Sequence, residues 1–413
     1  MATDVKYPPS VKAGKPILDE TPNGWARESL KNHLNLEQRK VKVEDNKEYD
    51  LVTVKRSRGG VVRREHLLGK QISVKSQFTL KEGDFLISKR QIVHGACGIV
   101  PTHLNGSIVS NEYSIFTAKD SFDLTYLRYL SETLYFQQTC FHSSIGVHIE
   151  KMIFKLDNWF KWDFNLPPLP EQRKIAKILS TWDKAIATTE KLIETSKHQK
   201  KALMQQLLTG KKRLVNPETG RAFEGEWEQF SFGDIANVSS KKHDPKKVST
   251  SVPCVELEHI KQESGGILGT ADSKDLASIK NKFTAGDVLF GKLRPYLKKY
   301  AFPSFDGVCS TEVWVLKAKK TIQPEYLYQF VQTNIFISEA NKSAGSKMPR
   351  ADWGVVSELI LKLPSLEEQK KITAVLNAAD EQLELLEAKL THFKQEKKAL
   401  MQQLLTGKRR VTV

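Results

Sequence analysis

Two long stretches of the sequence, residues 166–214 and 363–411, share one pattern of apolar and polar positions. In both, steps that alternate between four and three residues meet mostly apolar side chains, while charged and amide side chains fill the positions between them. This spacing is typical of a helix with a narrow apolar stripe, as in coiled coils. Each stretch begins after prolines and ends at a glycine, Gly210 or Gly407, followed by Lys and Arg. We therefore expect one long helix in each stretch.

The narrow stripe also predicts how the two helices are buried. At 1.5 Å per residue, the segment 171–209 would be a rod about 58 Å long. Such a rod needs a partner helix, and the chain between the two stretches is long enough to return. We expect the helices to pair with each other as an antiparallel coiled coil; the alternative is that each lies separately on its own globular domain. The predicted coiled-coil core consists of Ile175, Leu179, Trp182, Ile186, Ile193, Leu203 and Leu207 in the first helix and Ile372, Leu376, Leu383, Leu386, Leu390, Phe393, Leu400 and Leu404 in the second.

The two helical stretches are copies of one another. When they are aligned without a gap, about half of their positions are identical, and residues 200–211 are identical to residues 397–408. In the second copy, Ser365 and Glu368 have the spacing of a helix capping box. A match of this length indicates an internal duplication.

The segments outside the helices predict one mixed domain that is used twice. Short β-rich runs such as 49–54 and 313–316 lie between Gly, Asn and Pro turns, and a helical pattern follows. Landmarks recur in the same order, among them Trp25 and Trp227 and the sequences GDFLISK and GDVLFGK. We predict an α+β fold of two similar globular domains separated by two long helices, with a pseudo-twofold internal repeat. The expected divisions are an N-terminal extension (1–20), two globular domains (21–163 and 215–362) and two helical regions (164–214 and 363–413).

Net charge is the feature of the composition that most limits the possible functions of the chain. Lys and Arg total 64 against 48 Asp and Glu, a formal net charge of +16, and such a surplus favours a polyanionic partner such as nucleic acid. Hydrophobic residues make up 39% of the chain, which is enough for folded cores. There is no apolar run long enough for a membrane span and no apolar signal core at the N-terminus, so we expect a cytoplasmic protein. The four cysteines have no CxxC spacing and predict reduced, buried thiols.

The start of each long helix carries a family resemblance. The two starts read LPPLPEQRKIAKIL and LPSLEEQKKITAVL, so the motif L-P-x-L-x-E-Q occurs twice, and both helices end in LMQQLLTGK. In these features, and over nearly its whole length, the chain resembles the specificity subunit of type I restriction-modification enzymes. The resemblance implies a subunit without an active site, in which two target-recognition domains each read one half of a bipartite double-stranded DNA site.

The same resemblance implies the partners of the chain. The paired helices would act as a spacer, two methyltransferase (modification) subunits would dock on them, and a translocating restriction subunit would join. No cofactor is expected in this chain, because S-adenosylmethionine would be held by the methyltransferase partners. Two diverged domains on one rigid rod agree with this outline, because they would form a ruler between half-sites. Half-sites read on one face of the duplex would lie about 34–36 Å apart.

Basic and amide side chains in the loops are the candidate DNA contacts. The loop of residues 55–60 follows a predicted strand and places three cations beside two glycines, which permits close backbone approach to phosphates or bases. Arg and Gln also suit bidentate contacts with guanine and adenine. The alternative is a set of solvated basic loops. The candidates are Lys55, Arg56, Arg58, Arg63, Arg64, Lys89, Arg90, Gln91 and His94 in the first domain and Lys292, Arg294, Tyr296, Lys298, Lys299, Lys347 and Arg350 in the second.

Four glutamines are candidates for binding a partner protein. They lie off the apolar stripe in the identical helix ends, so helix pairing alone does not explain why both copies carry them. We expect residues 201–210 and 398–407 to present one docking surface twice, to two copies of a methyltransferase. The alternative is a recent duplication without selection. The four residues are Gln205, Gln206, Gln402 and Gln403.

Motifs for catalysis in this chain are weak. The sequence GDVLFGK at 286–292 has the outline of a phosphate-binding loop, but Leu293 stands where Ser or Thr would be needed. His142 and His148 have no convincing third ligand, so we expect no metal site. We therefore expect a protein that is not an enzyme. Two alternatives are a stand-alone DNA methyltransferase or nuclease with an unrecognised site, and a scaffold that binds nucleic acid without sequence specificity.

Overall fold

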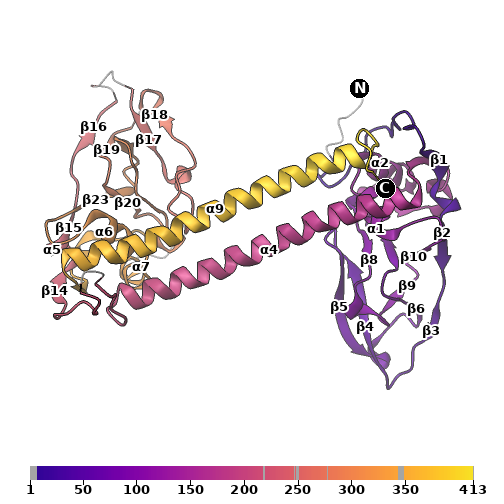
Figure 1. The fold of residues 1–413 in the computed structure, drawn as a ribbon, viewed down its shortest axis with the longest axis horizontal. Helices are drawn as coiled ribbons and strands as arrows, with labels where there is room; N and C mark the ends of the chain where they lie inside the picture. Colours follow the sequence, from indigo (N-terminus) through magenta and orange to yellow (C-terminus); the bar gives the residue numbers. More distant parts are fainter. Residues whose placement is uncertain are drawn as a thin grey trace. The chain divides into compact units, whose positions relative to one another are not determined.

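The computed structural model describes residues 7–216, 219–245, 247, 251–276, 278–342 and 348–412. Its longest elements are two helices of 39 residues, α4 (Leu169–Leu207) and α9 (Leu366–Leu404) (Figure 1). The chain divides into two compact units, one formed by Met1–Thr189 with Lys389–Val413 and the other by Glu190–Ala388. Each unit therefore contains one globular domain and part of both long helices. The two predicted helices are single unbroken elements.

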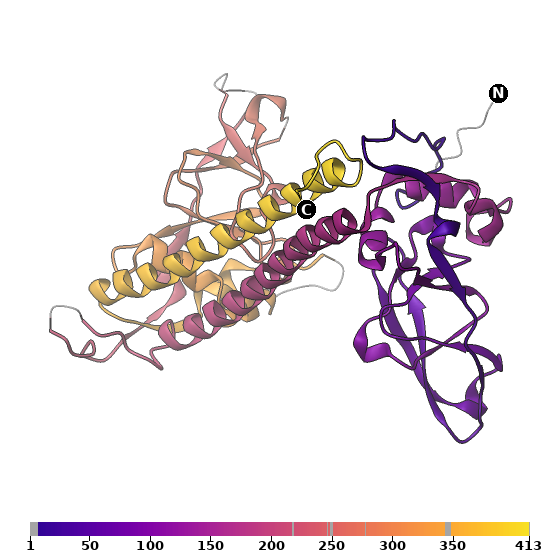
Figure 2. The same cartoon turned by 45° about the vertical axis from the view of Figure 1, so that its right-hand side comes forward.

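The first globular domain contains two main sheets and three short helices (Figure 2). One sheet has the order β2-β10-β7-β8 and the other the order β3-β6-β9-β4-β5. The pair β1-β13 leads the chain into α4, and the short pair β11-β12 follows α2. The elements are β1 (Ala26–Ser29), β2 (Leu34–Glu37), β3 (Lys40–Lys42), β4 (Glu48–Val54), β5 (Val61–Leu68), β6 (Ser76–Thr79), β7 (Phe85–Ser88), β8 (Cys97–Ile99), β9 (Ile108–Ser110), β10 (Tyr113–Ala118), α1 (Leu124–Leu130), α2 (Leu134–His142), β11 (Ser144–Ile145), β12 (Ile153–Phe154), α3 (Leu156–Trp159) and β13 (Asp163–Leu166).

The second globular domain repeats this topology. Its sheets have the orders β15-β23-β20-β21 and β16-β19-β22-β17-β18, and the pair β14-β24 leads into α9. Its elements are β14 (Glu228–Ser231), α5 (Phe232–Ile235), β15 (Ala236–Val238), β16 (Lys242–His243), β17 (Pro253–Val255), β18 (Ala271–Asp272), β19 (Lys280–Phe283), β20 (Val288–Gly291), β21 (Tyr300–Ala301), β22 (Gly307–Cys309), β23 (Val313–Ala318), α6 (Pro324–Val331), α7 (Asn334–Asn341), α8 (Trp353–Ser357) and β24 (Ile360–Leu363). The prediction of one α+β fold used twice is confirmed.

In each domain, different cores lie on the two faces of the four-stranded sheet, and the first domain has a further small cluster around Tyr49 and Ile108. Side chains alternate between the two faces of a strand, so neighbouring residues of β7 belong to different cores. Phe85 packs with the short helices, whereas Leu86 packs with valines of the five-stranded sheet. Phe290 and Leu289 of β20 divide in the same way. Burial on both faces explains why these two strands are almost wholly apolar in sequence.

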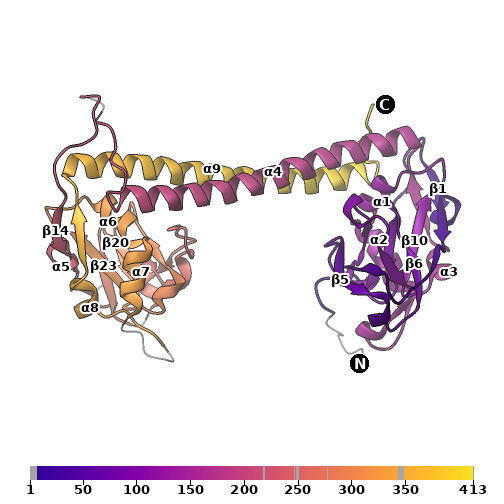
Figure 3. The same cartoon turned by 90° about the horizontal axis from the view of Figure 1, so that it is seen from below.

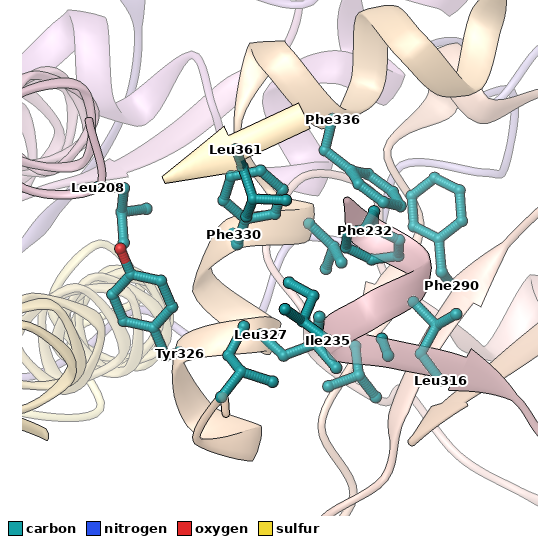
Figure 4. Close-up of a cluster of buried hydrophobic side chains, with 14 of the residues drawn as sticks. Leu208, Phe232, Ile235, Phe290, Leu316, Tyr326, Leu327, Phe330, Phe336 and Leu361 are labelled. Atoms are coloured by element: carbon teal, nitrogen blue, oxygen red, sulfur yellow. The ribbon is translucent and has the colours of Figure 1, made fainter. Parts of the chain in front are cut away.

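The ends of the long helices complete the helix-side cores. In the first unit, Ile175 and Leu179 near the start of α4 and Leu404 at the end of α9 belong to the domain core. In the second unit, Leu208 beyond the end of α4 packs in the same cluster as Tyr326, and this cluster includes Phe232, Phe290 and Phe336 (Figure 4). The apolar stripes of the helices are therefore not buried by helix pairing alone. Their ends are buried against the domains, because an apolar helix end covers an otherwise exposed core.

The helices also pair with each other, as an antiparallel pair (Figure 3). In the first unit, the rings of Trp182 and Phe393 meet edge to face with centroids 5.5 Å apart, and Lys397 binds Asp183 at 2.7 Å. In the second unit, Lys200 binds Asp380. Early residues of α4 thus face late residues of α9, and the reverse, as the predicted antiparallel coiled coil requires. Every predicted core residue of the two helices is buried or half-buried.

Two further expectations concern membrane-spanning helices and the state of the cysteines. Among the described helices, none is both long and apolar enough to cross a membrane. The cysteines are free and buried, as predicted, and occur as Cys97 and Cys140 in the first domain and Cys254 and Cys309 in the second. Burial raises the pKa of the Cys254 thiol to about 12, so this side chain is a packing residue of low reactivity.

Candidate nucleic-acid interface

Four loops of the first domain converge and bring together most of its predicted DNA contacts. Backbone hydrogen bonds join them: Ser57 N donates to His94 O at 2.7 Å, and Lys89 N donates to Glu112 O at 2.9 Å. Phe154 N donates to Lys89 O at 2.9 Å. We define the first loop cluster as residues 55–60, 89–96, 110–112 and 146–154.

Three cations of the first loop cluster, the exposed Arg56 and Arg90 and the half-buried Lys89, are held by acidic partners or by a carbonyl. Arg56 forms a bidentate ion pair with Glu150. Arg90 forms one with Glu112, and Lys89 donates to the carbonyl of Asn111. Together with exposed Lys55, these side chains make a basic surface whose cations have defined directions.

Two other candidates in this cluster, Arg58 and His94, contact groups within the protein. The Nε of Arg58 donates to the carbonyl of Ser131 at 3.0 Å. The His94 side chain is only 1% exposed; its Nδ1 lies 3.0 Å from Ser10 Oγ and its Nε2 lies 3.3 Å from the Glu150 carboxylate. Burial and nearby Arg56 lower the pKa of His94. Contrary to the prediction, His94 is therefore not available to contact a duplex, because its side chain is buried and bonds to groups within the domain.

The remaining candidates of the first domain lie close to or outside this cluster. Gln91 is half-buried within it, and its Oε1 has no hydrogen-bond partner among the described residues. Arg63 and Arg64 lie on β5, the edge strand of the five-stranded sheet, where Arg63 binds Asp50 at 2.9 Å. These two arginines are exposed but belong to a strand face.

The second domain has a corresponding group of converging loops. Lys292 N donates to Glu312 O at 2.9 Å, and Arg294 N donates to Pro349 O at 2.7 Å. Glu263 N donates to Lys298 O at 3.1 Å. We define the second loop cluster as residues 261–264, 292–299, 310–312 and 348–351. Lys347 lies outside the described residues.

The second loop cluster contains strained backbone at two predicted contacts. Arg294 and Lys298 flank the turn Pro295–Leu297 and have φ angles of +52° and +50°. This left-handed conformation costs a residue with a Cβ about 1–2 kcal/mol, and such strain is concentrated at functional sites. The turn between them leaves the Tyr296 side chain 51% exposed.

The other cations of the second cluster differ in how available they are. Lys298 pairs with Glu263 at 3.1 Å, and Arg350 forms a bidentate pair with Glu312. The Nζ of half-buried Lys299 donates to the carbonyl of Leu257 at 2.6 Å. Lys299 therefore anchors a loop, and its ammonium is directed into the protein.

The L-P-x-L-x-E-Q motif has a structural role that sequence reasoning missed. Glu171 is 3% exposed; it accepts two hydrogen bonds from Arg410, both at 2.7 Å, and one from Trp25 Nε1 at 3.1 Å. In the second unit Glu368, which is wholly buried, accepts two from Arg213 at 2.6 and 2.7 Å. Each motif glutamate thus binds an arginine that follows the other long helix.

The motif glutamine and the predicted capping box also have defined partners. Gln172 donates to the carbonyl of Pro167 and accepts from the backbone N–H of Asp123, and Gln369 does the same with Pro364 and Gln323. These bonds tie the helix start to the domain. The capping box is only half formed: Glu368 N donates to the Ser365 hydroxyl, but the Glu368 carboxylate binds Arg213 instead of the helix start. The signal for this pairing was the repeated Arg after each LTGK sequence.

The identical helix ends contain two kinds of residue. Some of their apolar side chains, including Met204, Leu207, Leu404 and Leu405, are buried in the domain cores. Packing therefore explains part of the identity without any partner. The glutamines at 205, 206, 402 and 403 are all exposed. In the second unit, Gln205 also lines a cleft of about 690 Å³ bordered by the helix pair and by residues 261–264.

The described part of the chain contains no candidate metal site. Among the residues that the structure describes, no group of three or more His, Cys, Asp and Glu side chains is arranged to hold a metal ion. The chemistry of both loop clusters is that of charge-assisted hydrogen bonding, which suits phosphates and base edges.

The chain thus contains two copies of one α+β domain, each with its own basic loop cluster and both joined to a pair of long helices. The sequence matches the family described as "Type I restriction modification DNA specificity domain" over residues 32–197 and again over 224–395. The chain belongs to this family and contains its domain twice.

Curated relatives carry the corresponding names. The type I restriction enzyme MjaVIII specificity subunit of Methanocaldococcus jannaschii is 27% identical over 284 residues, which is 64% of this chain and 65% of that protein. The EcoDI specificity subunit of Escherichia coli is 28% identical over 149 residues, 35% of this chain and 33% of that protein. The matched segments thus span between about a third and just under two thirds of these relatives.

Solved structures share the fold over nearly the whole chain. The HsdS subunit from Thermoanaerobacter tengcongensis is 17% identical with a TM-score of 0.51, and the match covers 94% of this chain and 98% of that one. The type I restriction-modification S subunit from M. genitalium is 14% identical with a TM-score of 0.57, covering 95% and 99%. At these identities the likeness concerns the fold.

Proposed function

We propose that this chain is the noncatalytic DNA-recognition subunit of a type I restriction-modification complex. Each recognition domain reads one half of a bipartite, asymmetric target in double-stranded DNA. The observation that carries this proposal is the occurrence of one fold twice in one chain, with a different loop cluster on each copy. A common scaffold with different reading loops suits two different half-sites.

The two loop clusters differ in ways that support different half-sites. The first cluster is built around the loop of residues 55–60 and the β11-β12 pair. The second is built around the turn Pro295–Leu297 and exposes Tyr296. Left-handed residues occur in both clusters, at Ser57 and Arg58 in the first and at Arg294 and Lys298 in the second. Because bases are read by side chains in specific directions, loops with different backbones present different donor and acceptor patterns.

Genome-wide mapping of methylated bases tests this function. The chain would be expressed together with a type I methyltransferase subunit from the same genome, in a host that lacks other methylation. We expect one split motif, in which two constant parts flank a fixed number of unspecified base pairs, and we expect it to disappear when this chain is omitted. Methylation of an uninterrupted site, or methylation by the purified chain alone with S-adenosylmethionine, would overturn the proposal.

A binding competition separates sequence recognition from binding by charge alone. A duplex that contains the mapped motif should compete better than random duplex by about 10³-fold or more. A scaffold that binds nucleic acid only through its net charge would show equal competition. The salt dependence of binding would be steep in both cases and does not distinguish them.

In the same proposal the long helices are the spacer and the docking platform. The exposed glutamines at the two helix ends contact two methyltransferase subunits, which hold S-adenosylmethionine, and a restriction subunit with translocase activity completes the complex in the cytoplasm. Native mass spectrometry should find two methyltransferases for each copy of this chain. Replacing Gln402 and Gln403 by alanine should reduce the complex to one methyltransferase, whereas a complex that saturates at one in the unaltered protein contradicts the docking model.

A further inference from the structure

The β11-β12 pair of the first loop cluster is a short two-stranded ribbon with one buried face and one exposed apolar face. Its strands pair antiparallel, with Ser144 opposite Phe154 and Ile145 opposite Ile153. Neighbouring residues of a strand point to opposite faces, so each of these pairs occupies one face of the ribbon. Ser144 and Phe154 are buried, whereas Ile145 is 57% exposed and Ile153 is 36% exposed. Isoleucines therefore stand on the exposed face, where a solvated ribbon would have polar residues.

The turn that joins the two strands adds a third exposed apolar residue. Val147 lies two residues after Ile145 and is 96% exposed. Single exposed apolar residues are common on protein surfaces, but a group of them marks an interaction surface. Three on one short hairpin form such a group.

Contacts with two neighbouring loops hold this hairpin in place. Phe154 N donates to Lys89 O at 2.9 Å, which joins β12 to the loop that follows β7. In the turn, Glu150 forms its bidentate ion pair with Arg56 of the loop between β4 and β5. The exposed apolar side chains are thus carried on a backbone that is fixed within the first loop cluster.

The charges around the hairpin favour DNA as the occupant of its apolar face. Lys55, Arg56 and Arg90 are exposed in the adjoining loops, and cations beside an apolar surface complement a polyanion that has apolar groups in its grooves. The major groove of B-DNA admits a two-stranded β-ribbon, and the apolar feature of this groove is the C5-methyl group of thymine. Ribbon shape, cations and apolar side chains therefore all match the major groove.

The corresponding segment of the second domain lacks these apolar residues in its sequence. Both segments follow the second short helix of their domain, α2 or α7. Residues 144–152 read SIGVHIEKM and residues 343–348 read SAGSKM, so the two share a serine, a glycine and a Lys-Met pair. Ala344 corresponds to Ile145, and the second segment is three residues shorter and has no valine or isoleucine. An apolar contact made by this hairpin would thus serve only one half-site.

We propose that the β11-β12 hairpin enters the major groove and that Ile145, Val147 and Ile153 contact thymine C5-methyl groups in one half-site. The inference rests on the proposed function and adds a specificity-determining surface to it. The methyl contact favours thymine at the positions that the hairpin reaches, while the neighbouring cations bind phosphates.

Replacing thymidine by deoxyuridine tests this contact, because it removes the C5-methyl group and leaves the base pair intact. The complete complex with its methyltransferases would be titrated with duplexes of the mapped motif, in which each thymidine in turn is replaced. We expect at least one replacement in one half-site to weaken binding by about fourfold, the value of one buried methyl group. If no thymidine of either half-site is sensitive, the proposal is wrong.

A double substitution assigns the effect to the hairpin. In Ile145→Ala with Val147→Ala, thymidine and deoxyuridine at the sensitive position should bind equally, and the other half-site should be unaffected. The matched control is Leu36→Ala with Val74→Ala, at residues that are 47% and 51% exposed outside the loop cluster. The control should keep the fourfold difference. Both variants should unfold at the same temperature as the unaltered protein, because the replaced side chains are exposed.

Other results would contradict the proposal in distinct ways. If the hairpin variant weakens both duplexes equally and keeps the difference between them, the methyl group is contacted elsewhere. If native mass spectrometry shows that this variant loses a methyltransferase while the difference persists, the apolar face binds that protein instead of DNA.

The same experiments separate this inference from the function on which it rests. If the unaltered complex yields no split motif, the proposed function fails. If a split motif is found but none of its thymidines is sensitive to loss of the methyl group, only the role of the hairpin fails.

Discussion

At the residue scale, the most constrained side chains are the two buried glutamates at the starts of the long helices. A buried carboxylate is costly unless it is paired and fully hydrogen-bonded. Glu171 meets this requirement through Arg410 and Trp25, and Glu368 meets it through Arg213. Gly407 and Gly210, with φ angles of +69° and +70°, end the preceding helices so that each arginine can turn back. These pairs join segments that are far apart in the chain.

Removing the arginine should therefore destabilise the first unit. Arg410→Ala leaves the buried Glu171 carboxylate without its cation, and we expect a loss of about 2 kcal/mol in the free energy of unfolding. Urea denaturation measures it. The matched control is Arg409→Ala, which removes an exposed neighbouring arginine and should change little. Equal effects of the two substitutions would show that the pair with Glu171 is energetically unimportant.

Asp183 gives the helix pair a pH dependence. Burial alone would raise the pKa of this carboxyl, but hydrogen bonds from Lys397, Arg128 and Tyr129 outweigh it, so the pKa lies below its ordinary value of 3.8. A carboxyl whose pKa is lower in the folded state stabilises the fold above its unfolded pKa and loses this contribution as the pH falls through the folded pKa.

The stability advantage of the unaltered protein over Asp183→Asn should accordingly be constant near neutral pH and shrink as the pH falls below about 4. Urea unfolding at a series of pH values from 7 to 3 measures this difference. Asp120→Asn, at an exposed turn position, serves as the control and should show no such change. A difference that stays constant down to pH 3 would argue against the assigned pKa direction.

At the element scale, each long helix uses different parts of its apolar stripe for two kinds of packing, against the globular domains and against the other helix. Their ends are buried in the domain cores, and their middles are covered mainly by one another. Most apolar residues of the middles are half-buried, with Ile193 as a buried exception, whereas several residues of the ends are fully buried. This division agrees with the near identity of the two C-terminal helix ends, because each of these ends must fit a similar domain.

The contact between Trp182 and Phe393 tests the pairing of the middles. Phe393→Ala should lower the free energy of unfolding by about 2 kcal/mol, less than the cost at a fully buried aromatic position. Leu385→Ala, at a leucine on the same helix that is 71% exposed, is the control and should be nearly neutral. Urea unfolding of both variants gives the comparison. If the two variants behave alike, the stripe is not the source of helix association.

At the scale of the whole molecule, the chain repeats one order of elements twice: a globular domain followed by a long helix. The end of α9 and the residues after it return to the first unit, where Leu404 and Arg410 complete the first domain. The end of α4 completes the second domain with Leu207 and Arg213. The core of the first domain thus includes the end of α9, and the core of the second domain includes the end of α4.

The proposed spacer role predicts how the DNA target responds to helix length. One heptad inserted between Thr189 and Glu190 and another between Ala388 and Lys389 would keep the stripe in register. The pair would lengthen by about 10 Å, or about three base pairs of DNA. Methylation mapping should find the same two half-sites with a spacer longer by that amount.

The control for this prediction is the same heptad in α4 alone. It shifts one helix past the other and should reduce stability without producing a longer spacer. An unchanged spacer in the double insertion would mean that another part of the complex sets the separation of the half-sites.

Much of the fold could be predicted from the sequence because its signals are local. Helices α4 and α9 follow from the period of their apolar stripe, and their pairing follows from the narrowness of that stripe. The duplication is visible by comparing the chain with itself. The L-P-x-L-x-E-Q motif was sufficient to find the family.

The candidate site was less predictable, because exposure and partnership depend on contacts between distant residues. Nothing in the local sequence separates His94, which is buried, from Arg90, which is exposed. Lys299 and Arg58 likewise read as basic loop residues until their carbonyl partners are seen.

The sequence by itself determined the two helices, the repeated α+β domain, the basic charge and the family, since periodicity, composition and motifs are properties of the chain. Only the tertiary structure decided that Glu171 binds Arg410 and that Glu368 binds Arg213. The physical reason is that such pairs are selected by the packing of whole elements, which places residues hundreds of positions apart within hydrogen-bonding distance.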